Sequence, residues 1–148
     1  MQTNQIRRDI NKILNSQQLG VLATYGSKYP YATIVGFVVT DDLSIILFAT
    51  FRETRKYRNM QADPHVSILM DNRSNRAEDF SSAQALTILG TAEDVPEDEE
   101  REYTGLYLQR HPHLREFISD PNCALMKVKV DKYILVSRFQ EVMELDMP

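Results

Sequence analysis

Three β-prone runs follow one another near the N-terminus with only short turns between them, and this feature limits the fold most. Residues 19–24, 31–40 and 43–50 are rich in Val, Ile, Thr and aromatic residues, which favour strands. The connections, Tyr25–Lys28 and Asp41-Asp42, leave no room for a crossover helix, which parallel strands require. The runs therefore predict an antiparallel meander. Their near-continuous apolarity predicts that a closed barrel, a packed helix or a dimer partner covers both faces.

The remaining segments alternate between helical and strand patterns. An apolar stripe at helical spacing predicts a helix within residues 4–15, and Thr54 and Pro64 delimit a short second helix. Further strands are expected at 65–71, at 84–95 and within 124–137, the last as a hairpin turning at Asp131-Lys132. A polar loop is expected at 72–83 and amphipathic helices at 97–118. This order predicts one mainly β, α+β antiparallel domain over residues 1–148.

Composition excludes several classes of site. The five glycines are too dispersed for G-x-G-x-x-G or a P-loop, so a nucleotide would have to be held in another way. One cysteine and three histidines exclude a disulfide framework and a Cys₄ or Cys₂His₂ zinc site within one chain, and no metal is expected. The formal net charge of −4 gives no overall attraction for nucleic acid or a membrane surface. With neither a membrane-spanning run nor a signal peptide, a cytoplasmic protein is expected.

Charge is concentrated at two places in the chain. Residues 93–102 hold seven acids and one base, whereas residues 52–58 hold four bases and one acid. Arg55 and Lys56 fall in the first turn of the predicted helix, where the helix dipole already makes cations unfavourable. A bound phosphate would reverse this effect, because it would accept from the free N–H groups, the Thr54 hydroxyl and both cations. The residues themselves leave open a phosphate site or a solvated basic turn.

The run from Phe48 to Leu69 resembles the pyridoxamine 5′-phosphate oxidase-like FMN-binding split-barrel superfamily. Its pattern is a strand ending in Thr, then Thr-Arg-Lys opening a helix, then Asp-Pro and a Val-rich strand. Residues 20–24 and 30–37 also fit this pattern. The resemblance implies a six-stranded antiparallel split β-barrel with flanking helices. It also implies a homodimer that binds FMN in a groove at the dimer interface.

The resemblance assigns cofactor-binding roles to ten residues. Arg55 and Lys56 match the phosphate-binding pair, with Thr54 beside them. Ala49 and Thr50 match the strand end next to the phosphate and ribityl chain. Gln84 matches a glutamine that reaches the flavin from the fifth strand. The backbone along the isoalloxazine ring is matched by Thr33, Ile34, Val35 and Gly36.

The chain lacks the C-terminal Arg-x-His motif of true pyridoxamine-phosphate oxidases; Ser137-Arg138-Phe139 is not followed by His. The resemblance is therefore to the short, general branch of the family. It implies a flavin-dependent oxidoreductase acting on a small molecule, with no side-chain nucleophile or general base because the flavin carries the chemistry. The alternative is a non-catalytic module that binds, carries or senses a flavin, haem or deazaflavin.

Overall fold

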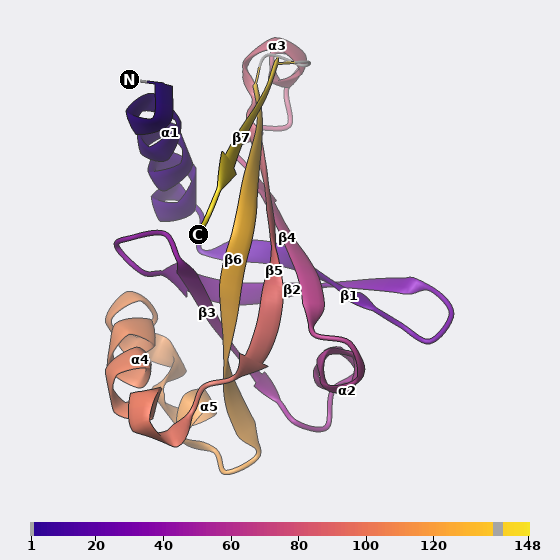
Figure 1. The fold of residues 1–148 in the computed structure, drawn as a ribbon, viewed down its shortest axis with the longest axis vertical. Helices are drawn as coiled ribbons and strands as arrows, with labels where there is room; N and C mark the ends of the chain where they lie inside the picture. Colours follow the sequence, from indigo (N-terminus) through magenta and orange to yellow (C-terminus); the bar gives the residue numbers. More distant parts are fainter. Residues whose placement is uncertain (1, 138–140) are drawn as a thin grey trace.

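Six antiparallel strands close into a barrel in the computed structural model, which describes residues 2–137 and 141–148 (Figure 1). The strands follow the order β3-β2-β1-β4-β5-β6, and β6 pairs with β3 to close the barrel. This confirms the predicted six-stranded barrel with flanking helices. The barrel strands are β1 (Leu19–Tyr25), β2 (Pro30–Val39), β3 (Ile45–Phe51), β4 (His65–Asp71), β5 (Ala85–Asp94) and β6 (Cys123–Ser137).

The barrel is split along β2. All of Pro30–Gly36 pairs with β1, but β2 pairs with β3 only at residues 37–39. Phe37 N–H donates toward β1, to Gln18 O, while Thr40 N–H donates toward β3, to Ile45 O. Because successive residues of a strand direct their backbone polar groups to opposite sides, Ile34 and Gly36 face the unpaired edge.

The predicted hairpin at Asp131-Lys132 is wrong, because β6 runs without interruption through these residues. Its first half pairs with both β3 and β5, and its second half pairs with β5 and with β7 (Glu141–Asp146). The irregularity in this region is a bulge on β6. Leu89 pairs with Lys132 and Gly90 pairs with Val130, so the intervening Asp131 is an extra residue without a partner on β5. The polar Asp-Lys pair was mistaken for a turn, although it marks this bulge, and Lys132 pairs with both β5 and β7.

Helices close the ends of the barrel and cover part of its wall. Apolar residues of α1 (Gln2–Ser16) enter the main core, and α2 (Arg55–Ala62) contributes Met60 to it. α4 (Glu97–Arg110) and α5 (Arg115–Ser119) pack outside β2, β3 and β6, with Tyr107 in a second core. A 3₁₀ turn at Pro112–Leu114 joins them, and the 72–83 segment contains the short helix α3 (Asp79–Ser82).

One part of the outer wall exposes apolar side chains. Leu19, Ile34 and Leu69 lie on neighbouring strands β1, β2 and β4, and their side chains are 58%, 63% and 45% exposed. Strand alternation places all three on the outward face. We call these three residues the exposed wall. None of the helices within the described ranges is both long and apolar enough to cross a membrane.

Candidate functional site

The start of α2 is fixed by two threonines. Thr54 is the N-cap, and its hydroxyl accepts from Tyr57 N–H at 3.3 Å, as the sequence predicts. The same hydroxyl lies 2.9 Å from that of Thr50, which is buried at the end of β3. Phe51 O lies within hydrogen-bond distance of both hydroxyls, so the hydroxyl that does not donate to the other threonine donates to this carbonyl. The strand end and the first helical turn are therefore held as one unit.

This unit forms one side of a pocket of about 210 Å³, which we call the β2–β3 pocket. The open edge of β2 forms the opposite side, and Tyr107, Leu114 and Phe117 of the α4–α5 segment supply apolar surface. Seven of the ten predicted cofactor-binding residues line it: Ile34, Val35, Gly36, Ala49, Thr50, Thr54 and Lys56. The structure thus brings together residues from β2, β3 and α2, as the resemblance implies.

Lys56 is the cation of the β2–β3 pocket. Its side chain is partly buried, and this desolvation lowers the pKa of the ammonium group. Within the described ranges, no carboxylate lies within ion-pair distance of its Nζ. A partly buried cation without a counterion, beside a helix N-terminus, is suited to binding an anion.

Arg55 lies on a different side of α2. Its guanidinium stacks over the Tyr31 ring, with Cζ 5.1 Å from the ring centroid. It lines a second pocket of about 440 Å³ between the β1–β2 hairpin and α2, which we call the hairpin pocket. Both pockets border the unpaired edge of β2, one at Pro30 and Tyr31 and the other at Ile34–Gly36. The Arg-Lys pair is therefore divided between two pockets on one strand edge.

Tyr107 occupies one of the backbone groups on the open edge of β2, so fewer of them are free to bind a ligand. Its hydroxyl donates to Gly36 O at 3.2 Å, and burial raises the pKa of this phenol to about 12. Ile34 retains an N–H and a carbonyl directed to the open edge. His111 contacts the next residue of β2, with its Nε2 2.7 Å from Phe37 O. Neither residue was predicted, because each acts through a contact with a distant part of the chain that leaves no local pattern in the sequence.

Thr33 and Gln84 stand apart from the β2–β3 pocket. Thr33 is on β2 but does not line the pocket, and its backbone groups face β1. Gln84 precedes β5 and donates to Ser137 Oγ at 3.0 Å, whereas Asp94 at the other end of β5 contacts α2. Ten residues of extended strand span about 33 Å. Gln84 therefore lies at the end of β5 that is remote from α2, and it is not among the residues that line the pocket.

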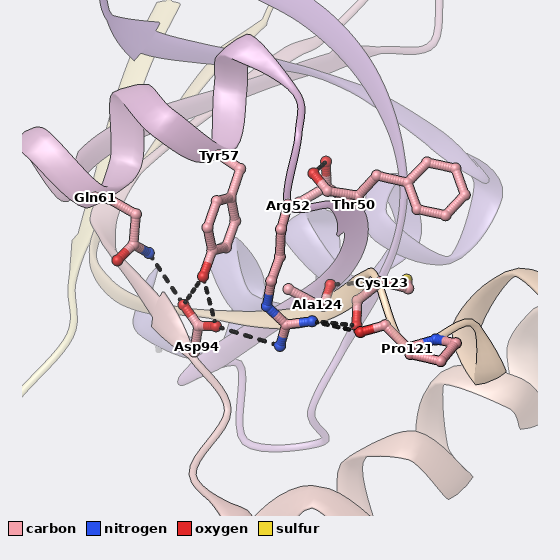
Figure 2. Close-up of polar contacts among 9 residues, drawn as sticks. Thr50, Arg52, Tyr57, Gln61, Asp94, Pro121, Cys123 and Ala124 are labelled. Carbon is pink, nitrogen blue, oxygen red and sulfur yellow. Dashed lines mark hydrogen bonds and ion pairs between the residues drawn. The ribbon is translucent and has the colours of Figure 1, made fainter.

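A polar network centred on Asp94 fastens α2 to the barrel (Figure 2). Tyr57 Oη donates to both carboxylate oxygens at 2.9 and 3.1 Å, and Gln61 Nε2 donates to Oδ1 at 3.0 Å. Arg52 approaches the same carboxylate at 3.8 Å and donates to the carbonyls of Pro121 and Cys123. The sequence gives no signal for this network, because its residues lie in the β3–α2 turn, on α2, at the end of β5 and in the segment that enters β6.

Comparison with known proteins agrees with the observed fold. The family described as Pyridoxamine 5'-phosphate oxidase matches residues 6–137. No curated protein matches the chain. A heme binding protein from Mycobacterium smegmatis superposes with a TM-score of 0.80 and 19% identity over 90% of this chain. The match spans only 55% of that larger protein.

Two further solved structures match most of their own length. One is a Clostridium acetobutylicum protein related to general stress protein 26 of the pyridoxinephosphate oxidase family. It has a TM-score of 0.74 and 14% identity, over 97% of this chain and 95% of that one. The other is a FAD-binding protein from Mesorhizobium loti, with a TM-score of 0.69 and 15% identity over 87% and 90%. At these identities the structures establish a shared fold. With the family match over most of its length, the chain belongs to the pyridoxamine 5'-phosphate oxidase-like split-barrel superfamily.

Proposed function

We propose that this protein binds FMN in the β2–β3 pocket. The observation that carries the proposal is the convergence of an unpartnered, partly buried Lys56, the hydroxyls of Thr50 and Thr54, and the open edge of β2 on one pocket. The phosphate of FMN is a monoester with about −1.5 to −2 charge at pH 7, which pairs with the lysine ammonium. A planar flavin edge can exchange hydrogen bonds with the free backbone groups of Ile34. The residues present therefore fit the cofactor that the resemblance implies.

Each part of the chain has a distinct task in this proposal. Lys56 and the α2 N-terminus bind the phosphate, while Thr54 holds the helix start in place. Tyr107 orients the Gly36 carbonyl and shields the ring edge from water. Bound flavin supplies electron or hydride transfer, which none of these side chains can perform. We infer that the protein is an oxidoreductase acting on a small molecule, without a side-chain nucleophile.

The second half of the proposal is a homodimer joined through the exposed wall. Burying Leu19, Ile34 and Leu69 against a second copy would remove apolar surface from water. Ile34 belongs both to this wall and to the β2–β3 pocket, so the pocket and the proposed interface are continuous. Because Gln84 does not line the pocket of its own protomer, we assign its predicted flavin contact to the pocket of the partner subunit.

A non-catalytic carrier is the second candidate, and one structural neighbour is named as a heme binding protein. Haem iron is usually held by His, Cys, Met or tyrosinate. Within the described ranges, the side chains lining the β2–β3 pocket include only Tyr107 from this set, and its raised pKa opposes tyrosinate formation. This chemistry favours flavin over haem in this pocket.

The visible spectrum of the freshly purified protein tests the proposal. Flavin absorption approaching one equivalent per chain is expected, directly or after addition of FMN. Anaerobic reduction by NADH or NADPH, followed by turnover with an added acceptor, distinguishes an oxidoreductase from a carrier. A haem Soret band, or failure to take up added FMN, would overturn the assignment.

A further inference from the structure

The hairpin pocket is lined by positively charged side chains that do not line the β2–β3 pocket. Three cations line it: Lys28 from the β1–β2 turn, and Arg55 and Arg58 from α2. Within the described part of the chain, none of the three forms an ion pair with a carboxylate. Arg58 donates to a backbone carbonyl, Glu53 O, at 2.8 Å. Three neighbouring like charges repel each other, and a multiply charged anion would relieve this repulsion.

Aromatic rings accompany these cations. Arg55 stacks over Tyr31, and Lys28 Nζ lies 5.5 Å from the centroid of the Tyr29 ring. A guanidinium stacked by its face keeps its N–H edge available to phosphate oxygens. The Tyr29 side chain is 71% exposed, so a planar base can stack on it. The pocket thus offers phosphate-binding and base-stacking groups together.

The position of the hairpin pocket points to a long ligand. Tyr31 at this pocket and Gly36 at the β2–β3 pocket are five residues apart on one extended strand, about 17 Å. The first turn of α2 lies between them, with Lys56 on one side and Arg55 on the other. A ligand that places a planar ring at Gly36 and a phosphate at Lys56 can continue along the same edge into the hairpin pocket.

We propose that the hairpin pocket binds the adenosine diphosphate moiety of a dinucleotide. The pyrophosphate pairs with Lys28, Arg55 and Arg58, and the adenine stacks on Tyr29. This moiety occurs both in FAD and in the nicotinamide dinucleotides that donate hydride to flavins. The inference extends the proposed function, because the dinucleotide would meet the flavin site along β2.

Binding of free ADP to the protein tests the hairpin pocket independently of any flavin. We expect saturable binding by calorimetry, weakened at least tenfold in the Lys28→Ala/Arg58→Ala double variant. The matched control, Arg8→Ala/Lys12→Ala, removes the same charge from the exposed side of α1 and should leave ADP affinity within twofold. Tyr29→Phe should retain binding, whereas Tyr29→Ala should weaken it.

FMN titration of the same variants separates this inference from the proposed function. Lys28→Ala/Arg58→Ala should bind FMN within twofold of the wild type. If FMN binds but ADP does not, the proposed ADP site is wrong and the proposed flavin site is retained. The same conclusion follows if Lys28→Ala/Arg58→Ala and the control Arg8→Ala/Lys12→Ala lose ADP affinity equally. If ADP binds and FMN does not, the proposed function is wrong and the proposed ADP site in the hairpin pocket is retained.

Separate titrations with FAD and with a nicotinamide dinucleotide show which of these ligands supplies the adenosine diphosphate moiety. If FAD is the ligand, FAD should bind at least tenfold more tightly than FMN, and the advantage should disappear in Lys28→Ala/Arg58→Ala. If a nicotinamide dinucleotide is the ligand, NADH or NADPH should bind the FMN-loaded protein with the same dependence on these two residues. If neither dinucleotide responds to the double substitution, the proposal is overturned.

Discussion

The hydroxyl groups of Thr50 and Thr54 lie 2.9 Å apart, joining the buried end of β3 to the first turn of α2. This contact places the helix N-terminus beside the β2–β3 pocket. Among the described residues that line the pocket, this is the one contact between two hydroxyl groups, and it joins a strand to the helix that follows it. Its removal should therefore affect both the stability of the fold and the affinity for a phosphate.

Thr54→Ala should destabilise the protein by about 1 kcal/mol, the usual cost of losing a helix N-cap. Urea unfolding of the protein without ligand measures this effect. Thr54→Ser keeps the hydroxyl and should recover most of the lost stability. Equal stability of the Ala and Ser variants would contradict the capping role that the structure gives to Thr54.

Tyr57→Phe should loosen α2 by removing the two contacts to Asp94 (Figure 2). Hydrogen bonds to a charged group contribute about 1.5–3 kcal/mol, so a loss of this order in the free energy of unfolding is expected. FMN affinity should fall as well, because the network positions the helix that carries Lys56. Tyr25→Phe, at an exposed tyrosine, is the matched control. Unchanged unfolding and FMN affinity would show that the network does not fix the helix.

Alkaline pH should destabilise the fold partly through Tyr107. Burial raises the pKa of this phenol to about 12, whereas an unfolded tyrosine titrates near 10. As the pH rises from about 10 to 12, the unfolded chain loses its proton first, so the folded state loses relative stability. The slope from this group is at most about 1.4 kcal/mol per pH unit. Tyr107→Phe should make the decline shallower in urea unfolding at pH 9 to 12, and an equally steep decline in both proteins would contradict this contribution.

Leu69→Arg should disrupt the proposed dimer without damaging the barrel. The Leu69 side chain is 45% exposed in the single chain, so a charged replacement remains solvated there but would be buried in the interface. Light scattering should show a monomer, and circular dichroism an unchanged strand content. Flavin affinity should fall with the loss of the partner's contribution. A wild-type chain that is already monomeric would contradict the interface.

The parts of the fold that could be predicted from the sequence are those set by residues close together in the chain. Short polar turns between apolar runs predicted the meander, and Thr54 and Pro64 delimited α2. The continuity of β6 could not be predicted, because Asp131 forms a bulge and Lys132 is held extended by pairing with β5 and β7, which lie elsewhere in the chain. The last strand, Glu141–Asp146, likewise depends on this pairing.

The candidate site was predictable only in part, for the same reason. The Thr-Arg-Lys motif identified the residues at the α2 start, and the family pattern added the neighbouring strand positions. The orientation of side chains around the helix decided that Arg55 and Lys56 enter different pockets. Tyr107 and Asp94 act through contacts with distant elements, so no local pattern indicated them.

Fluorescence titration of FMN into the wild-type protein and the Arg55→Ala/Lys56→Ala variant tests the central claim most directly. The wild type should quench FMN fluorescence with saturation at one equivalent per chain, and the double variant should lose at least 100-fold in affinity. Arg8→Ala/Lys12→Ala, which lowers the net charge equally, should bind like the wild type. Retention of FMN by Arg55→Ala/Lys56→Ala with wild-type affinity would contradict the placement of the cofactor at the start of α2.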